Sequence, residues 1–167
     1  MLLVVCTGNI CRSPLAEAFL RRELSARLGP RTPQVRSAGT IARDGFPARE
    51  ETVEVGSEYG VDLSGFRTSA LTPELIRGAD LVVGMAGEHR REVIGLVPEA
   101  AALAFTLKEL VRLLEAIPAG SDRKARLAAA HASRGVGFAG NPNDEDVADP
   151  LGLSMDAYRA VAWELES

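Results

Sequence analysis

A cysteine, an arginine and a serine near the N-terminus have the types and spacing to act on a phosphate group. Cys6 ends an apolar run, Arg12 follows six positions later, and Ser13 comes next. A cysteine thiolate is a strong nucleophile, and the planar guanidinium of arginine matches two phosphate oxygens. A serine hydroxyl can cap a helix and can also lie beside a thiolate. The pattern Cys-x5-Arg-Ser therefore predicts a nucleophile and an anion clamp in one loop.

The residues inside this loop suit a tight turn around an anion. Gly8 has no Cβ, and Asn9 tolerates left-handed backbone angles and can hydrogen-bond within the loop. A helix with Ser13 as its cap and Pro14 in its first turn would direct N–H groups and a positive dipole end toward the loop, which favours a thiolate and an oxyanion. The predicted phosphate-binding residues are Thr7, Gly8, Asn9, Ile10, Cys11, Arg12 and Ser13.

Other interpretations of the cysteines are weaker. A lone cysteine at a strand end is usually a small buried hydrophobe, and Cys-x5-Arg alone also arises by chance. A zinc site would have only Cys6, Cys11, His89 and His131 to draw on, so we expect no metal and no cofactor. The Gly-x4-Gly-Lys-Ser/Thr pattern of a nucleotide-binding loop is absent.

Cleavage of a phosphate ester also needs a proton for the leaving group, and a carboxylic acid far along the chain can supply it. Asp149 precedes Pro150, which stiffens the loop and favours an extended backbone at Asp149. Asp144, Glu145 and Asp146 lie close by, so spacing alone leaves the choice among these acids open.

Apolar and helical patterns alternate along the chain. Strands are predicted at 2–6, 35–38, 81–85 and 102–105, and helices at 14–28, 47–59, 72–75, 88–96, 107–117, 121–133 and 154–166, with a Gly- and Asn-rich loop at 135–143. This alternation predicts an α/β fold in which helices cover both faces of a parallel sheet. Ligands of such folds lie at the carboxyl ends of strands, where the Cys6 loop is placed.

Bulk properties narrow the function. The 167 residues suffice for one domain, taken here as residues 1–167. No apolar run reaches the roughly 18 residues of a membrane span, no signal peptide is evident, and two cysteines make no disulfide framework, so we expect a cytoplasmic protein that does not bind membranes. A net charge of −4 without a basic tract argues against a nucleic-acid partner.

The stretch Cys6-Thr7-Gly8-Asn9-Ile10-Cys11-Arg12-Ser13-Pro14 resembles the signature of the low-molecular-weight protein tyrosine phosphatases. The segments 35–40, 59–64 and 79–83 and the residue His89 also resemble that family, and Asp149-Pro150 is similar in position to its general acid. The resemblance implies a doubly wound fold with a four-stranded parallel sheet. Residues 118–145 are not matched, and two interpretations stay open for them: a mobile insertion, or an ordinary surface helix and connection.

The resemblance also implies roles for single residues. Cys6 would attack phosphorus and form a cysteinyl-phosphate, Arg12 would hold the oxygens, and Asp149 would act as general acid and then as base. Ser37 and His89 would support the loop from outside it, although a plain strand-end serine and a plain helix-face histidine are open alternatives. Cys11 would close a protective disulfide with Cys6 under oxidants, although a buried structural cysteine is an equal alternative.

The substrate is the least determined feature. We expect a phosphorylated protein, and phosphotyrosine before phosphoarginine, because the apolar Ile10 inside the loop suits an aromatic ring. The pattern Gly152-x-Ser154-x3-Tyr158 favours the arginine-phosphatase branch instead. Arsenate reduction is disfavoured because no cysteine follows Cys11. A phosphate-binding regulatory module with little catalysis is a further alternative, and the oligomeric state is not predicted.

Overall fold

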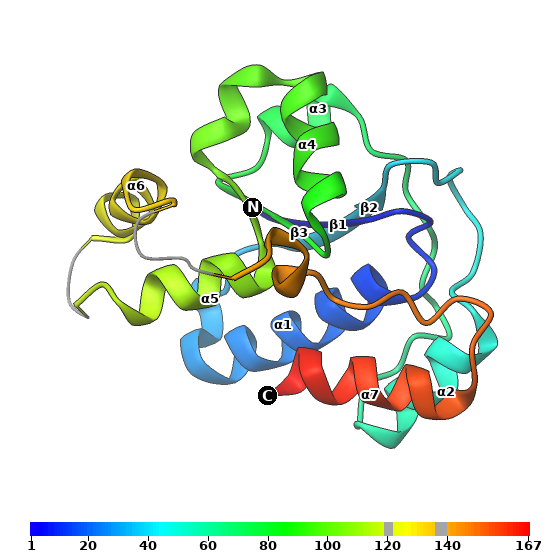
Figure 1. The fold of residues 1–167 in the computed structure, drawn as a ribbon. Helices are drawn as coiled ribbons and strands as arrows, with labels where there is room; N and C mark the ends of the chain where they lie inside the picture. The colour runs from blue at the N-terminus through cyan, green and yellow to red at the C-terminus, as the bar shows by residue number, and fades with distance from the viewer. Residues whose placement is uncertain (119–121, 136–139) are drawn as a thin grey trace.

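The computed structural model describes residues 1–118, 122–135 and 140–167, and Figure 1 shows their arrangement. The elements, in chain order, are β1 (Leu2–Cys6), α1 (Arg12–Leu28), η1 (Gly29–Arg31), β2 (Val35–Gly39), α2 (Glu50–Glu58), α3 (Pro73–Arg77), β3 (Leu81–Gly84), α4 (Gly87–Leu96), η2 (Pro98–Ala102), β4 (Ala104–Thr106), α5 (Leu107–Glu115), α6 (Arg123–Ala132), η3 (Pro142–Glu145) and α7 (Met155–Glu166).

The sheet has four parallel strands in the order β2-β1-β3-β4. The chain runs from β1 outward to β2 and then returns to the other side of β1 with β3, so the strand order reverses beside β1. Such a reversal opens a crevice at the carboxyl ends of the strands. Cys6, the last residue of β1, lies at that end. The predicted doubly wound α/β fold is therefore confirmed.

Helices cover both faces of the sheet, and each face has its own apolar core (Figure 1). On one face, Val4 and Phe105 pack with residues of α1, α5 and α7. On the other face, Leu3 and Val5 pack with residues of α3 and α4. The side chains of neighbouring positions in β1 point to opposite faces, as strand geometry requires. Both faces being buried explains the unbroken apolar run at the N-terminus.

A third cluster fixes α1 relative to α2 and α7. Leu15 and Phe19 of α1 pack against Val55 of α2 and Tyr158 of α7, all of them buried. This cluster packs against the first turns of α1. The N-terminal end of that helix, which carries Arg12 and Ser13, is consequently held in place by the core.

Two helix starts differ from the sequence prediction, and both differences arise from tertiary contacts. Ser13 does not cap α1: the helix begins at Arg12, Cys11 takes the cap position, and no side chain caps it. The second helix begins at Glu50 instead of 47, because the N–H of Arg49 is bound to the carbonyl of Ile10 in the Cys6 loop. In α3, the Oγ1 of Thr72 accepts from the N–H of Leu75 as a helix cap.

Later elements agree in type and shift in their bounds. The fourth strand is 104–106 instead of 102–105, because residues 98–102 form the short helix η2. Within 118–145, α6 occupies 123–132, inside the predicted helix 121–133. Of the predicted loop 135–143, residues 136–139 lie outside the described residues, as do 119–121, and η3 begins at Pro142. The prediction of an insertion there stays a prediction.

A search of the described residues finds no helix with the length and hydropathy to cross a bilayer. Nor do three metal-ligating side chains of His, Cys, Asp or Glu gather anywhere in the described ranges.

Candidate active site

Cys6 lies at the bottom of the loop that joins β1 to α1, with its thiol sulfur surrounded by donors. The side chain is only 2% exposed. The backbone N–H of Asn9 donates to the Cys6 Sγ at 3.3 Å, and the Ser13 Oγ lies 3.0 Å from the same sulfur. The first turn of α1 contains no acidic residue and no capping side chain, so the positive end of the helix faces the loop uncompensated. This environment stabilises an anion at the sulfur.

Asn9 holds the loop in shape. Its backbone has a φ of 54°, the left-handed conformation that the sequence predicted. Its buried side-chain amide donates to the Ser13 Oγ at 2.8 Å and to the Ser37 Oγ at 2.9 Å. Its Oδ1 accepts from the N–H of Ser69 at 2.8 Å, which fixes the orientation of the amide. Because Ser13 accepts from Asn9, its own hydroxyl hydrogen is free to point at the Cys6 sulfur.

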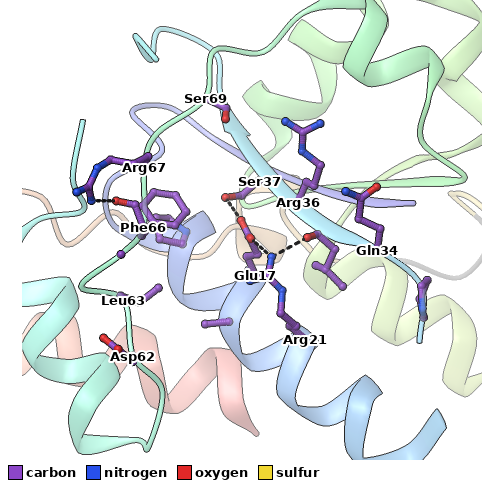
Figure 2. A pocket seen from close by; sticks show the side chains of 15 residues that line it. Glu17, Arg21, Gln34, Arg36, Ser37, Asp62, Leu63, Phe66, Arg67 and Ser69 are labelled. Carbon is purple, nitrogen blue, oxygen red and sulfur yellow. Dashed lines mark hydrogen bonds and ion pairs between the residues drawn. The ribbon is translucent and has the colours of Figure 1, made fainter. Parts of the chain in front are cut away.

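The contact with Ser37 continues outward to a carboxylate. The Ser37 Oγ donates to Glu17 at 2.5 Å, and Arg21 donates both to Glu17 and to the carbonyl of Val35. Figure 2 shows this chain of contacts between α1 and the edge strand β2, on the wall of a cavity of about 620 Å³ behind the loop. The Glu17 carboxylate thus sets the direction of the Ser37 hydroxyl, which then can only accept from Asn9.

Two glycines and the start of α2 complete the frame of the loop. A Cβ on Gly39 would lie 2.6 Å from the carbonyl oxygen of Thr7, so only glycine allows β2 to approach this closely. Gly8, predicted to allow a tight turn because it has no Cβ, does not have a positive φ, and the left-handed conformation is that of Asn9. Thr52 donates through Oγ1 to the carbonyl of Ile10 at 3.0 Å, which ties the loop to α2.

Arg12 joins the loop to the C-terminal segment that contains Asp149. The side chain is 4% exposed. Its Nη1 donates to the carbonyl of Val147 at 3.1 Å, and its Nη2 donates to the Thr7 Oγ1 at 3.3 Å and to the Asp149 Oδ2 at 2.5 Å. Arg12 and Asp149, 137 positions apart in the chain, are therefore in direct contact, and both line one cavity together with Cys6.

Asp149 is the partly exposed member of this group. The N–H of Leu151 donates to its other oxygen, Oδ1, at 3.1 Å, and the following Pro150 is buried. The carboxylate is thus fixed by its own turn and by the guanidinium. Among the four acids that the sequence left open, only Asp149 touches Arg12. Asp144 accepts from Asn141, Glu145 from Arg112 and Asp146 from Gly87.

His89 lies behind the loop on α4 and is nearly fully buried. Its Nε2 lies 2.9 Å from the Thr7 Oγ1, and Thr7 in turn accepts from Arg12. Burial, and secondly the positive charge of Arg12, lower the pKa of His89 to about 4. The ring is consequently neutral at neutral pH and supports Thr7 as a hydrogen-bond partner without adding charge.

Cys11 points away from the loop into the third apolar cluster. Its Sγ lies 3.6 Å from the hydroxyl of Tyr158. Burial raises the pKa of the Cys11 thiol, and burial also raises the pKa of Tyr158 to about 12. Both cysteines are free. The predicted disulfide with Cys6 stays a prediction.

A cavity of about 340 Å³ opens above Cys6. Its walls are largely apolar, and three of the side chains at its rim are strongly exposed: Ile41 at 76%, Phe46 at 56% and Leu151 at 51%. Ile10, Arg12, Arg43 and Asp149 line the same space. A flat apolar group attached to an anion would fit this arrangement.

The family model described as "Low molecular weight phosphotyrosine protein phosphatase" matches residues 1–116. The chain belongs to this family. The match includes the whole loop from Cys6 to Pro14 and ends before Asp149. The predicted resemblance is therefore confirmed.

Members of both branches of the family are similar to the chain. A probable low molecular weight protein-tyrosine-phosphatase, EpsP of Ralstonia solanacearum, is 41% identical over 109 residues, which are 65% of this chain and 71% of that protein. A protein-arginine-phosphatase of Geobacillus stearothermophilus is 31% identical over 166 residues, 99% of this chain and 88% of that protein. The crystal structure of the low molecular weight protein tyrosine phosphatase from T. tengcongensis has a TM-score of 0.73 and 38% identity, covering 99% of this chain and 91% of that one.

Several residues that frame the phosphatase loop were not found from the sequence. They are Glu17, Gly39, Thr52, Ser69, Asp146 and Val147. Only Gly39 carried a signal, as part of the Ser-Ala-Gly-Thr segment that resembles the family. The others act through contacts between distant parts of the chain, and four of them act through backbone groups or a single side-chain bond that no local pattern reveals.

The buried His89 predicts a pH-dependent stability. The folded protein keeps His89 neutral down to a pH of about 4, whereas the unfolded chain protonates it below about 6.5, so stability is lost as the pH falls through this window. His89→Gln removes this contribution. Its free energy of unfolding should fall less steeply between pH 6.5 and 4 than that of the wild type, by up to about 1.4 kcal/mol per pH unit.

Denaturant titrations at several pH values measure this difference. His131→Gln, which removes an exposed histidine of α6, is the control and should follow the wild type. Equal slopes for all three proteins would contradict the account of His89.

Proposed function

We propose that the protein is a protein tyrosine phosphatase that hydrolyses phosphotyrosine through a cysteinyl-phosphate on Cys6. The observation that carries the proposal is that Cys6, Arg12 and Asp149 line one cavity, with Arg12 bound to Asp149. These three groups are a nucleophile, an oxyanion clamp and a proton donor. Family membership supports the same reaction class.

In the first step, the Cys6 thiolate attacks phosphorus and a sulfur–phosphorus bond forms. The phosphorus–oxygen bond to the leaving group breaks, and its electron pair goes to the leaving oxygen, which takes a proton from Asp149. Arg12 and the N–H groups at the start of α1 stabilise the equatorial oxygens as charge builds up. The Ser13 hydroxyl, 3.0 Å from the sulfur, stabilises the thiolate before the attack and when it leaves again.

In the second step, water attacks the cysteinyl-phosphate while Asp149, now a carboxylate, takes its proton. The sulfur–phosphorus bond breaks, and inorganic phosphate and the thiolate remain. In the free protein the carboxylate of Asp149 occupies one guanidinium nitrogen of Arg12. A substrate phosphate would take over that nitrogen, and the released Asp149 carboxylate would take up a proton from solvent before it faces the leaving group.

The cavity above the loop supports an aromatic substrate. A phenyl ring can pack against Ile10, Ile41 and Phe46, and burying such a ring is favourable. The guanidinium of phosphoarginine carries a positive charge and several donors, and would need acceptors on the wall. Asp149 is the one carboxylate among the described residues that line the cavity. The positive charge of Arg43 would repel a guanidinium.

Arginine phosphatase activity is the second candidate. Two observations favour it: the protein-arginine-phosphatase of Geobacillus stearothermophilus is similar over 99% of this chain, and the pattern Gly152-x-Ser154-x3-Tyr158 follows Asp149-Pro150. Gly152 has a φ of 78°, so it makes a turn that an aromatic residue would adopt only with strain. We give more weight to Ile10, because it lies inside the phosphate loop and lines the cavity.

The mechanism predicts the behaviour of two variants. Turnover of a phosphotyrosine peptide should proceed in EDTA, should be lost in Cys6→Ser, and should fall roughly 10²- to 10⁴-fold in Asp149→Ala, because the leaving phenolate is then not protonated. Release of inorganic phosphate measures the turnover of the wild type and of both variants. Asp144→Ala, which removes a neighbouring acid that does not touch Arg12, is the control and should keep full activity. No turnover by the reduced wild type on phosphotyrosine, phosphoarginine or p-nitrophenyl phosphate would leave a phosphate-binding module instead.

Ile10 predicts the choice of substrate. Ile10→Thr exchanges an apolar wall for a hydroxyl that can accept from a guanidinium, so the ratio of kcat/KM for phosphotyrosine to that for phosphoarginine should fall about tenfold or more. Ile41→Thr makes the same change at the exposed rim and should alter the ratio much less. A wild type that prefers phosphoarginine would contradict the tyrosine assignment and support the second candidate.

A further inference from the structure

The segment that carries Asp149 has no regular secondary structure, so its position must come from single contacts. Residues 146–150 run past the ends of β3 and the start of α4 (Figure 1). Among the described residues, Asp149 itself is hydrogen-bonded to Arg12 and within its own turn. The contact with Arg12 is lost when a substrate phosphate binds to Arg12, if the proposed mechanism holds. The carboxylate then needs a support that does not involve the phosphate.

Asp146 supplies such a support. Its Oδ1 accepts from the N–H of Gly87, the first residue of α4, at 2.7 Å. Its backbone carbonyl accepts from the Nζ of Lys108 at 2.8 Å, at the start of α5. A carboxylate is favoured at a helix N-terminus by the helix dipole and by the free N–H groups. The segment is therefore fixed to two helices three residues before Asp149.

Val147, the next residue, connects this anchored backbone to the active site. The N–H of Val147 donates to the carbonyl of Met85 at 2.7 Å, its side chain is buried in the core, and its carbonyl accepts from Arg12. Asp146 thus anchors one end of a short stretch of backbone. Asp149 lies at the other end, and the carbonyl of Val147, between them, accepts from Arg12. The other acids of the segment make different contacts: Glu145 binds Arg112, and Asp144 binds the N–H of Asn141.

We propose that Asp146 is a positioning residue for the reaction: by anchoring residues 146–149 on the N-terminus of α4, it places Asp149 to protonate the leaving group. The proposal rests on the proposed function, because it concerns how well Asp149 works as an acid. Asp146 touches neither the substrate nor the reacting atoms. Its effect should appear in proton transfer to the leaving group and not as a uniform loss of activity.

Leaving groups of different acidity separate these two effects. Phenolate is a poor leaving group that needs a proton. p-Nitrophenolate is a weaker base, so it leaves with less help from an acid. The kcat/KM value reports the steps up to departure of the leaving group. In Asp146→Ala, the ratio of kcat/KM for phenyl phosphate to that for p-nitrophenyl phosphate should fall about tenfold or more. A merely structural defect would lower both values alike and leave the ratio unchanged.

Three further variants make the test specific. Asp146→Asn keeps an oxygen that can accept from Gly87 and should restore the ratio to within about threefold of the wild type. Asp144→Ala should leave it unchanged. Asp146→Ala added to Asp149→Ala should change it no further, because the acid is then already absent. Thermal unfolding of each variant confirms that the compared proteins are folded.

The outcomes distinguish this proposal from the proposed function. A reduced ratio in Asp149→Ala with an unchanged ratio in Asp146→Ala would overturn the role of Asp146 alone. An unchanged ratio in Asp149→Ala itself would overturn Asp149 as the proton donor, and with it the proposed mechanism. An Asp146→Asn variant that behaves like Asp146→Ala would overturn the hydrogen bond to Gly87 as the cause.

Discussion

The shape of the loop after β1 depends on the buried amide of Asn9. The left-handed backbone costs a residue with a Cβ roughly 1–2 kcal/mol, and asparagine somewhat less. Three side-chain hydrogen bonds, to Ser13, Ser37 and Ser69, offset this cost, since a buried amide left without partners would lose about 1–3 kcal/mol per unmade bond. The same bonds leave the Ser13 hydroxyl free for Cys6. The conformation of the loop and the contact between Ser13 and the Cys6 sulfur therefore both depend on the side chain of Asn9.

Arg12 connects the two parts of the site, because it is hydrogen-bonded to residues from both ends of the chain. It donates to Thr7 in the loop and to Val147 and Asp149 in the C-terminal segment. A guanidinium that is nearly fully buried needs such partners to offset its loss of hydration. The partners also orient it, so that the phosphate-binding group and the proton donor are placed by the same contacts. Asp146, on the N-terminus of α4, and Glu17, behind Ser37, fix this arrangement from outside.

The sequence was sufficient where the relevant residues are neighbours in the chain. The alternation of strands and helices, the left-handed Asn9 and the contiguous loop from Cys6 to Ser13 follow from local preferences. The choice of Asp149 among its neighbouring acids rested on the Asp149-Pro150 pair together with the family resemblance. Local preference was insufficient where tertiary contacts decide. Ser13 left its predicted cap position because Asn9 and Cys6 occupy its hydroxyl. The bonds from Asn9 to Ser69 and from Gly87 to Asp146 span 60 and 59 positions, so no local pattern contains them.

The central claim is that phosphate passes through the sulfur of Cys6, and the most direct measurement is to trap that intermediate. With p-nitrophenyl phosphate, Asp149→Ala should accumulate it, because this leaving group departs largely without an acid while the base for the second step is missing. After mixing with p-nitrophenyl phosphate and rapid quenching in acid, peptide mass spectrometry should locate a phosphoryl group on Cys6. Its absence at every quench time while phosphate is released, or its location on another residue, would contradict the account.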